Sequence, residues 1–383
     1  MLDNRIISNK HNNPDNDRSK DDLKKRSLEI YEDDTFFDLV GYGKLIYHPE
    51  KLVGIKNETN PFPITATISL GNFCNHGCLW CSTAYFREDD AFAIDGDKLI
   101  NWVTKAKDRG LRGVGYVGNG EPLAFKKFKT ISKKINDLDI DQGIFTNGYL
   151  IDRYEEELLQ FAYVRISLDA GTAETHSKLH AVKNNHFPKI IQNVEKLIKN
   201  KKDNFPTVGF QFATHQDNIE ELELAVKIAR DIGVNYLSVK PVFDRGTVKD
   251  KIARNSLTKK DFDEAVGNLS KYRDETFKIF YRPQQIISES MEQNQLVYNR
   301  CYAPYLGVNI YEDGGIVGCG PHHIEVGNLD TPLDDLEKNI IKASKSFDLV
   351  KCPAGCRYHA ANYLVNQVIE PTKIKKTKHI NML

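Results

Sequence analysis

The sequence lacks an excess of charge of either sign, and it lacks any long run of apolar residues. Lysine plus arginine and aspartate plus glutamate each number 53 in 383 residues, so the formal net charge is zero. A balanced charge gives no general attraction to nucleic acid or to an anionic membrane surface. No apolar stretch approaches the ~20 residues that span a bilayer, and the N-terminus is charged rather than an apolar signal segment. We therefore expect a cytoplasmic protein that binds neither nucleic acid nor membrane.

Cysteine is scarce and unevenly placed. The seven cysteines fall into one group of three and one group of four. An odd number leaves a disulfide framework incomplete, whereas compact groups of thiols suit metal binding in a reducing compartment. The cysteines are therefore predicted to be metal ligands.

Composition divides the chain into four segments. Residues 1–26 carry few apolar side chains and are expected to form a flexible tail. Residues 27–63 are punctuated by prolines and are expected to lay an extended arm on the next segment. Residues 64–276 should form a large domain and residues 277–383 a smaller one, because 383 residues exceed one minimal domain.

The large segment alternates β-type runs with amphipathic helical patterns. The expected strands are Thr65–Leu70, Gly113–Val117, Gly143–Thr146, Tyr163–Leu168, Thr207–Ala213 and Tyr236–Lys240. The expected helices are Lys98–Arg109, Phe128–Leu138, Ile190–Lys199, Ile219–Ile232 and Lys259–Tyr272. Such alternation predicts an α/β fold with a parallel sheet and right-handed crossovers.

The pattern of the smaller segment is of the α+β type. Apolar runs at Leu306–Tyr311 and Ile316–Gly318 flank a Gly-containing turn, which predicts a hairpin. Helical patterns follow at Leu333–Phe347 and Tyr358–Ile369.

The first cysteine group reads Cys74-Asn75-His76-Gly77-Cys78-Leu79-Trp80-Cys81. The spacing C-x3-C-x2-C puts three thiolates on one tight loop, where each can bind one iron of a [4Fe–4S] cube. The fourth iron is then left without a protein ligand, which makes it a place for chemistry. A zinc site with His76 as the fourth ligand is the alternative.

This loop resembles the cluster loop of radical S-adenosylmethionine (SAM) enzymes, C-x3-C-x-aromatic-C, with Trp80 at the aromatic position. The resemblance implies a partial (β/α)6 barrel of the TIM type with the loop after its first strand. It also implies that SAM chelates the open iron of a cluster on Cys74, Cys78 and Cys81. One electron from a flavodoxin or ferredoxin then cleaves SAM to a 5'-deoxyadenosyl radical, which abstracts hydrogen from a substrate.

Polar groups at the strand ends match further positions of this family. The second strand ends in Gly118-Asn119-Gly120-Glu121-Pro122, where the glycines would allow close approach to a ligand and Glu121 would hold the SAM amino group. A plain Gly-rich turn is the alternative. The resemblance extends to Asn147 after the third strand and Ser167 on the fourth. The fifth strand departs from the family pattern, and its Gln211 is a lone polar group that could face the barrel interior.

Three residues are candidates for the base that hydroxyl oxidation would require: Asp169, His215 and Lys240. All three lie at the ends of expected strands, where active sites form in parallel barrels. Asp169 could instead be a turn or N-cap residue. Lys240 could merely mark the point where its strand meets water.

The four remaining cysteines resemble those of the SPASM and twitch extensions of radical SAM enzymes. Cys301 is followed by twelve residues, Gly314, four residues and Cys319, and Cys352-x3-Cys356 completes the set. The match is closer to twitch, with one auxiliary [4Fe–4S] cluster, because no cysteine is left for another. Four thiolates close a cube, so its expected task is to accept or relay an electron. The alternatives are a structural zinc ion, or a ligand set with His322 or His323 in place of one cysteine.

The assignment of all seven cysteines as ligands leaves no thiol to donate a hydrogen, which favours oxidation over epimerisation. The cysteine layout resembles that of a twitch-type cyclitol dehydrogenase, which implies dehydrogenation of a small polar metabolite such as a cyclitol, sugar or nucleoside. The short, polar N-terminal segment also favours a small molecule over a peptide. A peptide-modifying enzyme that forms cross-links or oxidises its substrate is the alternative. A non-catalytic metal-binding scaffold is the alternative of another class.

Overall fold

The computed structural model describes residues 42–81, 83, 92–202, 205–242, 257–281, 298–352, 356 and 358–370. Contacts divide the chain into two units, Met1–Pro49 and Glu50–Leu383. In the first unit a 3₁₀-helix, η2 (Tyr42–Tyr47), is described. The expected tail, and the expected arm up to residue 41, lie outside the described residues.

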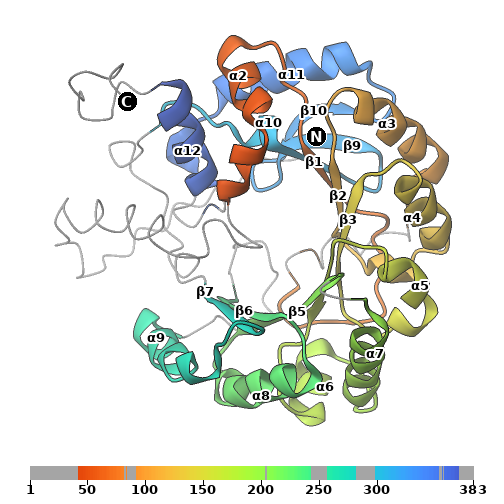
Figure 1. The fold of residues 1–383 in the computed structure, drawn as a ribbon, viewed down its shortest axis with the longest axis vertical. Helices are drawn as coiled ribbons and strands as arrows, with labels where there is room; N and C mark the ends of the chain where they lie inside the picture. The colour runs from red at the N-terminus through yellow and green to blue at the C-terminus, as the bar shows by residue number, and fades with distance from the viewer. Residues whose placement is uncertain are drawn as a thin grey trace, which may run out of the picture. The chain divides into compact units, whose positions relative to one another are not determined.

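The second unit is built on one curved, ten-stranded sheet (Figure 1). Its strands run in the order β10-β9-β8-β1-β2-β3-β4-β5-β6-β7. Neighbours from β8 through β7 are parallel, whereas β9 and β10 extend the β8 edge in antiparallel pairing. The strands are β1 (Thr65–Ile68), β2 (Gly113–Tyr116), β3 (Asp141–Thr146), β4 (Tyr163–Ser167), β5 (Thr207–Thr214), β6 (Tyr236–Pro241), β7 (Lys278–Tyr281), β8 (Gly307–Ile310), β9 (Gly315–Cys319) and β10 (Ile324–Asn328).

Helices connect the parallel strands and lie along the convex side of the sheet, as α3, α4, α7 and α8 show in Figure 1. The α-helices are α2 (Pro49–Asn57), α3 (Gly96–Asp108), α4 (Phe128–Asn136), α5 (Glu155–Leu158), α6 (Ala173–His180), α7 (His186–Asn200), α8 (Leu222–Ile232), α9 (Lys259–Gly267), α10 (Ala303–Leu306), α11 (Leu333–Ser346) and α12 (His359–Ile369). Short 3₁₀-helices are η4 (Pro122–Ala124), η5 (Ile151–Arg153), η6 (Ile219–Glu221), η7 (Ser270–Tyr272) and η10 (Leu349–Lys351). Within the described ranges no helix has the length and apolar character needed to cross a membrane.

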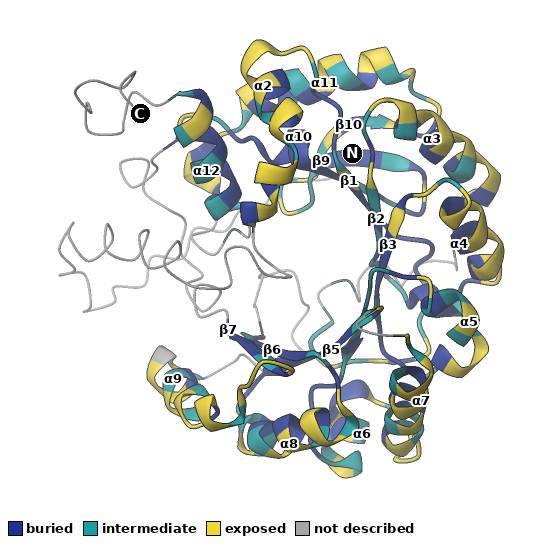
Figure 2. Cartoon of the chain, viewed as in Figure 1, coloured by how far each residue is buried: buried dark blue, intermediate teal, exposed yellow. Residues whose placement is uncertain are grey.

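Burial alternates along β1, β2 and β4, whereas β5 and β6 are buried over most of their length (Figure 2). The side chains that point toward the helices are apolar and buried, among them Ile68, Val114, Ile144, Val164, Ile166, Phe210, Phe212, Leu237 and Val239. The residues between them are mostly glycine or polar and point toward the concave face of the sheet. The predicted α/β fold with a partial TIM-like barrel is therefore confirmed.

Two tyrosine rings cover glycines inside the barrel near the N-terminal ends of the strands. A Cβ added to Gly143 would lie 2.2 Å from the ring of Tyr163, and one added to Gly209 would lie 2.4 Å from the ring of Tyr236. Only glycine leaves room for these rings. These rings fill the interior of the barrel near the N-terminal ends of the strands. The polar concave face lies toward the C-terminal ends of the strands.

The expected hairpin forms from β8 and β9, and Tyr311 N donates to Gly315 O at 2.9 Å where it closes. The sequence pattern did not predict β7, or that β8 would pair in parallel with β1. The sheet therefore continues across the proposed boundary at residue 277, and the division into segments 64–276 and 277–383 stays a prediction.

Candidate functional site

The first cysteine group lies on the loop that follows β1, at the C-terminal ends of the parallel strands. Cys74, Cys78 and Cys81 are partly exposed and form no disulfide. The loop is tied to the end of α6, because Gly77 N donates to His180 O at 2.9 Å and Leu79 N donates to Leu179 O at 2.9 Å. The backbone of the loop is thus held by protein contacts alone.

The turn after β2 holds the other side of this loop. A Cβ on Gly120 would lie 2.1 Å from Phe73 O, and Glu121 N donates to the same oxygen at 2.9 Å. Gly118 is equally tight, since a Cβ there would lie 2.6 Å from Ser69 Oγ. The space over both glycines is filled by the chain around β1. Close approach of two protein segments therefore explains these glycines, and their role toward SAM, like that of Pro122, stays a prediction.

The carboxylate of Glu121 is buried and accepts three hydrogen bonds: from Thr146 Oγ1 at 2.6 Å, Asn147 N at 2.8 Å and Leu123 N at 3.1 Å. Burial raises the pKa of Glu121, and these hydrogen bonds act in the opposite direction. Asn147 in turn donates from Nδ2 to Asn75 Oδ1 of the cysteine loop at 2.7 Å. The structure brings both predicted SAM-binding residues to the loop.

A polar row crosses the concave face toward the strand ends. Ser167, Gln211 and Ser238 are paired across β4, β5 and β6, so their side chains point to the same face. Arg165 lies two residues before Ser167, with its guanidinium carbon 3.6 Å from the centre of the Phe145 ring. Ser167 and Gln211 are partly exposed and could contact a ligand within the barrel.

The three predicted bases have different surroundings. Asp169 is buried, accepts from Ala213 N at 2.7 Å through Oδ1, and has a left-handed backbone with φ of 56°. His215 is also buried, with its ring 5.4 Å from that of Trp80. Lys240 is partly exposed on β6. As catalytic bases, all three stay predictions.

Asp169 is not the N-cap of the helix that follows it. The N-cap of α6 is Thr172, whose side chain accepts from Thr175 N. The alternative that Asp169 caps this helix is therefore wrong.

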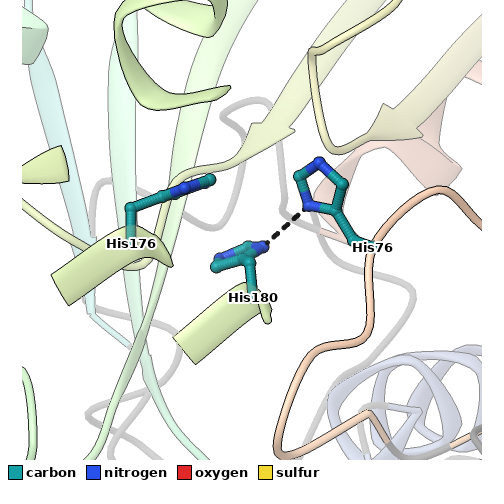
Figure 3. A group of neighbouring side chains, drawn as sticks. All are labelled: His76, His176 and His180. Atoms are coloured by element: carbon teal, nitrogen blue, oxygen red, sulfur yellow. Dashed lines mark hydrogen bonds between the residues drawn. The ribbon is translucent and has the colours of Figure 1, made fainter. Parts of the chain in front are cut away.

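A histidine cluster beside the cysteine loop was not predicted. Figure 3 shows His76 from the loop turned toward His180 of α6, with His176 one helical turn away. The Nδ1 atoms of His76 and His180 lie 3.2 Å apart, and His186 Nδ1 lies 3.3 Å from His76 Nε2. Burial, with the neighbouring histidines adding to it, lowers the pKa of His76 to about 3 and that of His176 to about 2. The spacing His176-x3-His180 was the available signal, since it places two histidines on one helix face.

His180 differs from the other histidines because it faces two acidic groups. Its Nδ1 lies 3.4 Å from Cys78 Sγ, and its Nε2 lies 3.4 Å from Asp169 Oδ2. Burial opposes protonation, but Cys78 and Asp169 outweigh it and raise the pKa of His180 to about 10.

The C-terminal cysteines gather around one small core. Cys301 and Cys352 are buried there with Tyr298, Ala303 and Leu349. Burial raises the pKa of both thiols to about 12, and Cys319 and Cys356 act in the same direction on each. This mutual effect indicates that the four thiols lie near one another.

The positions of His322 and His323 do not decide whether either is a metal ligand. The ring of His322 lies 6.1 Å from that of Phe347, which packs against the same core, and the ring of His323 lies 5.4 Å from that of Tyr311.

The thiol donors of both cysteine groups suit a [4Fe–4S] cube, whose irons are bound by cysteine thiolates. Among the described residues, the one group of metal-binding side chains with ligand atoms within 4.8 Å of one another is His76, His176 and His180. A tetrahedral zinc ion with Zn–S bonds of about 2.3 Å would hold its sulfurs roughly 3.8 Å apart. A [4Fe–4S] cube binds each thiolate to a different iron and so holds them more widely. Among the described residues, neither cysteine group has three sulfurs within 4.8 Å of one another, and His76 lies with the two histidines of α6.

The comparisons with known proteins agree with this site. Residues 68–229 match the sequence model of the "Radical SAM superfamily". A GTP 3',8-cyclase of Nautilia profundicola is 23% identical over 163 residues, which cover 41% of this chain and 51% of the cyclase. The chain thus spans about half the length of that relative. The sporulation killing factor maturation protein SkfB of Bacillus subtilis is 24% identical over 298 residues, which cover 76% of this chain and 68% of SkfB.

Solved structures show the same fold. Streptococcus suis SuiB bound to S-adenosylmethionine superposes with a TM-score of 0.61 at 17% identity, covering 86% of this chain and 78% of SuiB. SuiB bound to the precursor peptide SuiA gives a TM-score of 0.61 at 18% identity, covering 86% and 79%. The cysteine loop at the strand ends and most of the parallel barrel lie in the matched segment, so residues 68–229 form a radical SAM domain.

Proposed function

We propose that this protein is a radical SAM enzyme that abstracts hydrogen from a peptide substrate. Cys74, Cys78 and Cys81 would hold a [4Fe–4S] cluster, since their spacing leaves one iron open and their loop lies at the strand ends. The bound cluster and SAM would supply a carbon-centred radical that can abstract hydrogen. The observation that carries this proposal is the position of the three-cysteine loop within the matched domain.

The chain's own residues would orient and shield the reacting groups. Glu121 and Asn147 lie against the cysteine loop and offer polar atoms toward the amino group of SAM. Ser167 and Gln211 stand further along the concave face and could bind its carboxylate or ribose. The tyrosine-filled end of the barrel would exclude water from below.

The lengths of the alignments favour a peptide substrate. The alignment with the GTP cyclase covers 163 residues, about the size of the matched domain. The alignment with SkfB covers 298 residues and so includes chain outside residues 68–229. The relative that shares more than the barrel is thus by name a maturation protein of sporulation killing factor, and SuiB, which has the same fold, was solved with a precursor peptide. The small polar metabolite expected from the sequence is the second candidate.

One observation supports that second candidate. The concave face carries Arg165 and Lys240 among hydroxyl and amide groups, which suits a compact polar or anionic molecule enclosed in the barrel. Oxidation by dehydrogenation, with the base among the predicted residues, remains the proposed reaction for such a substrate.

We further propose that Cys301, Cys319, Cys352 and Cys356 hold a second [4Fe–4S] cluster that accepts an electron after hydrogen abstraction. The convergence of these thiols around one buried core supports it. A flavodoxin or ferredoxin would reduce the first cluster.

Metal analysis of anaerobically reconstituted protein tests both clusters. We expect about eight irons per chain in the wild type, and about four after substitution of either cysteine group by serine. Zinc in place of iron at the C-terminal group would refute the second cluster. If SAM cleavage is lost only when Cys74, Cys78 and Cys81 are substituted, the first cluster cleaves SAM and the second does not. If the wild type does not cleave SAM, the protein is a non-catalytic scaffold.

Formation of 5'-deoxyadenosine with different substrates tests the substrate class. Peptides encoded near this gene should stimulate SAM cleavage above the basal rate and change in mass, whereas nucleotides, sugars and cyclitols should not. Stimulation by a small molecule alone would replace the first candidate by the second.

A further inference from the structure

His180 contacts the cysteine loop through both its backbone and its side chain. Its carbonyl accepts the N–H of Gly77 at 2.9 Å, and its Nδ1 lies 3.4 Å from Cys78 Sγ. It is the last residue of α6, so the helix end and the imidazole reach the loop together. Neither contact requires a bound cofactor.

The neighbours of His180 hold its ring in one orientation. The ring of His176 stacks on it with centres 4.1 Å apart and planes at 13°, and the ring of His76 stands at 87° to it with centres 5.3 Å apart (Figure 3). On the other edge of the ring, Nε2 lies 3.4 Å from Asp169 Oδ2, an ion-pair distance. Asp169 is itself fixed by Ala213 N. His176 therefore packs on one face of the ring, and Asp169 lies beside Nε2 without a hydrogen bond, while Nδ1 is directed at the loop.

A metal ion shared by His76, His176 and His180 is the competing explanation. Neither ring nitrogen of His176 has a hydrogen-bond partner among the described residues, as a missing ion would explain. A metal ion, however, binds an imidazole nitrogen close to the plane of its ring. The rings of His176 and His180 are nearly parallel and 4.1 Å apart, so one ion cannot lie in both planes. Packing of His176 against His180 is the arrangement that the geometry favours.

We propose that His180 is a positioning residue that donates an N–H···S hydrogen bond to Cys78 and makes the proposed SAM-binding cluster easier to reduce. The inference rests on the proposed function, because Cys78 must be a cluster ligand. Two acceptors face Nδ1, Cys78 Sγ and His76 Nδ1. A thiolate bound to iron carries negative charge, and hydrogen bonds to charged acceptors are the stronger ones. Since reduction adds an electron, a donor to the cluster sulfur stabilises the reduced form and raises the potential.

The test is a redox titration of the full-length holoprotein, followed by electron paramagnetic resonance. The signal that changes on addition of SAM identifies the cluster on Cys78. In His180→Leu we expect its midpoint potential to fall by an amount corresponding to roughly tenfold in the reduction equilibrium, about 59 mV for one electron. His180→Gln keeps an N–H donor and should recover part of the shift. The signal that does not respond to SAM should keep its potential, which controls for general damage to the fold.

His176→Phe is the matched control, because it keeps a ring stacked on His180 and removes both nitrogens. We expect the potential and metal content of this variant to equal those of the wild type. Loss of a bound zinc or other divalent ion in His176→Phe would overturn the proposal in favour of a three-histidine metal site. An unchanged potential in a His180→Leu protein that retains its cluster would also overturn it. If the wild type shows no SAM-responsive signal, the proposed function itself fails, which is a different result.

Discussion

The substitution Gly120→Ala should displace the cysteine loop. The added Cβ would lie 2.1 Å from Phe73 O, 2.7 Å from Gly71 O and 2.8 Å from the Phe73 carbonyl carbon. A carbon atom approaches a carbonyl oxygen no closer than roughly 3.3 Å in folded proteins, so the two segments must separate by about 1 Å. Phe73 immediately precedes Cys74, so this separation would move the first cluster ligand.

The cost of this separation follows from two contributions. Overpacking a tight contact costs typically about 1–3 kcal/mol, and weakening the hydrogen bond from Glu121 N to Phe73 O adds about 1 kcal/mol. We therefore expect Gly120→Ala to lower the free energy of unfolding by about 2–4 kcal/mol. Because the strain is local to the loop, iron should fall from about eight to about four per chain while the C-terminal group keeps its share.

Iron analysis and urea denaturation measure the two effects. The matched control is Gly113→Ala on β2, the strand before this turn, where a Cβ would meet Thr65 Cγ2 at 3.5 Å and Asp141 O at 3.7 Å, which are ordinary contacts. If Gly120→Ala retains all of its iron and unfolds within about 0.5 kcal/mol of this control, the turn does not constrain the loop and the reasoning is wrong.

Three further predictions concern buried polar groups. Asn119→Ala removes the amide that donates to both carboxylate oxygens of the buried Glu312, at 2.9 and 3.1 Å, and should cost about 1–3 kcal/mol in urea denaturation. Adding Glu312→Ala should recover part of this loss, and strictly additive losses would contradict the contact. Burial lowers the pKa of Lys51 from 10.5 to about 7, so the unfolded chain binds more protons between these values and stability should rise with pH across that window. Lys51→Met should flatten the rise relative to the wild type, and equal slopes would refute the assignment. Glu121→Gln replaces the carboxylate by an amide, whose NH₂ group must face at least one of the three groups that donate to Glu121. We therefore expect a lower melting temperature at every pH tested. An unchanged melting temperature would show that these three hydrogen bonds are not essential.

The strands of the barrel could be predicted from the sequence because their pattern is local. The run around Ile166 buries every second side chain, and the run around Phe210 is buried over most of its length. Both patterns can be recognised from the local sequence. The hairpin signal before residue 320 was also correct. It could not show that β8 pairs with β1, because a turn pattern specifies neighbours in sequence and not the sheet edge that the hairpin joins.

Helix α6 was missed because its buried face is made partly of histidines. His176 and His180 are 0% and 1% exposed, but a count of apolar residues treats both as polar. Their burial depends on the cysteine loop and on Asp169, which are remote in sequence and adjacent only in the fold. For the same reason the sequence could place Asp169 at a strand end but could not identify the histidine that it faces.

The turn after β2 links the two cysteine groups through protein contacts alone. On one side, Gly120 and Glu121 hold the backbone of the loop that carries the first group. On the other, Asn119 donates to Glu312 in the turn between β8 and β9. Strand β9 ends at Cys319 of the second group. Since β8 also pairs with β1, the hairpin and the loop are fixed to the same strand. Their relative position is therefore set by the sheet before either group binds metal, which is the arrangement that electron transfer between two clusters would require.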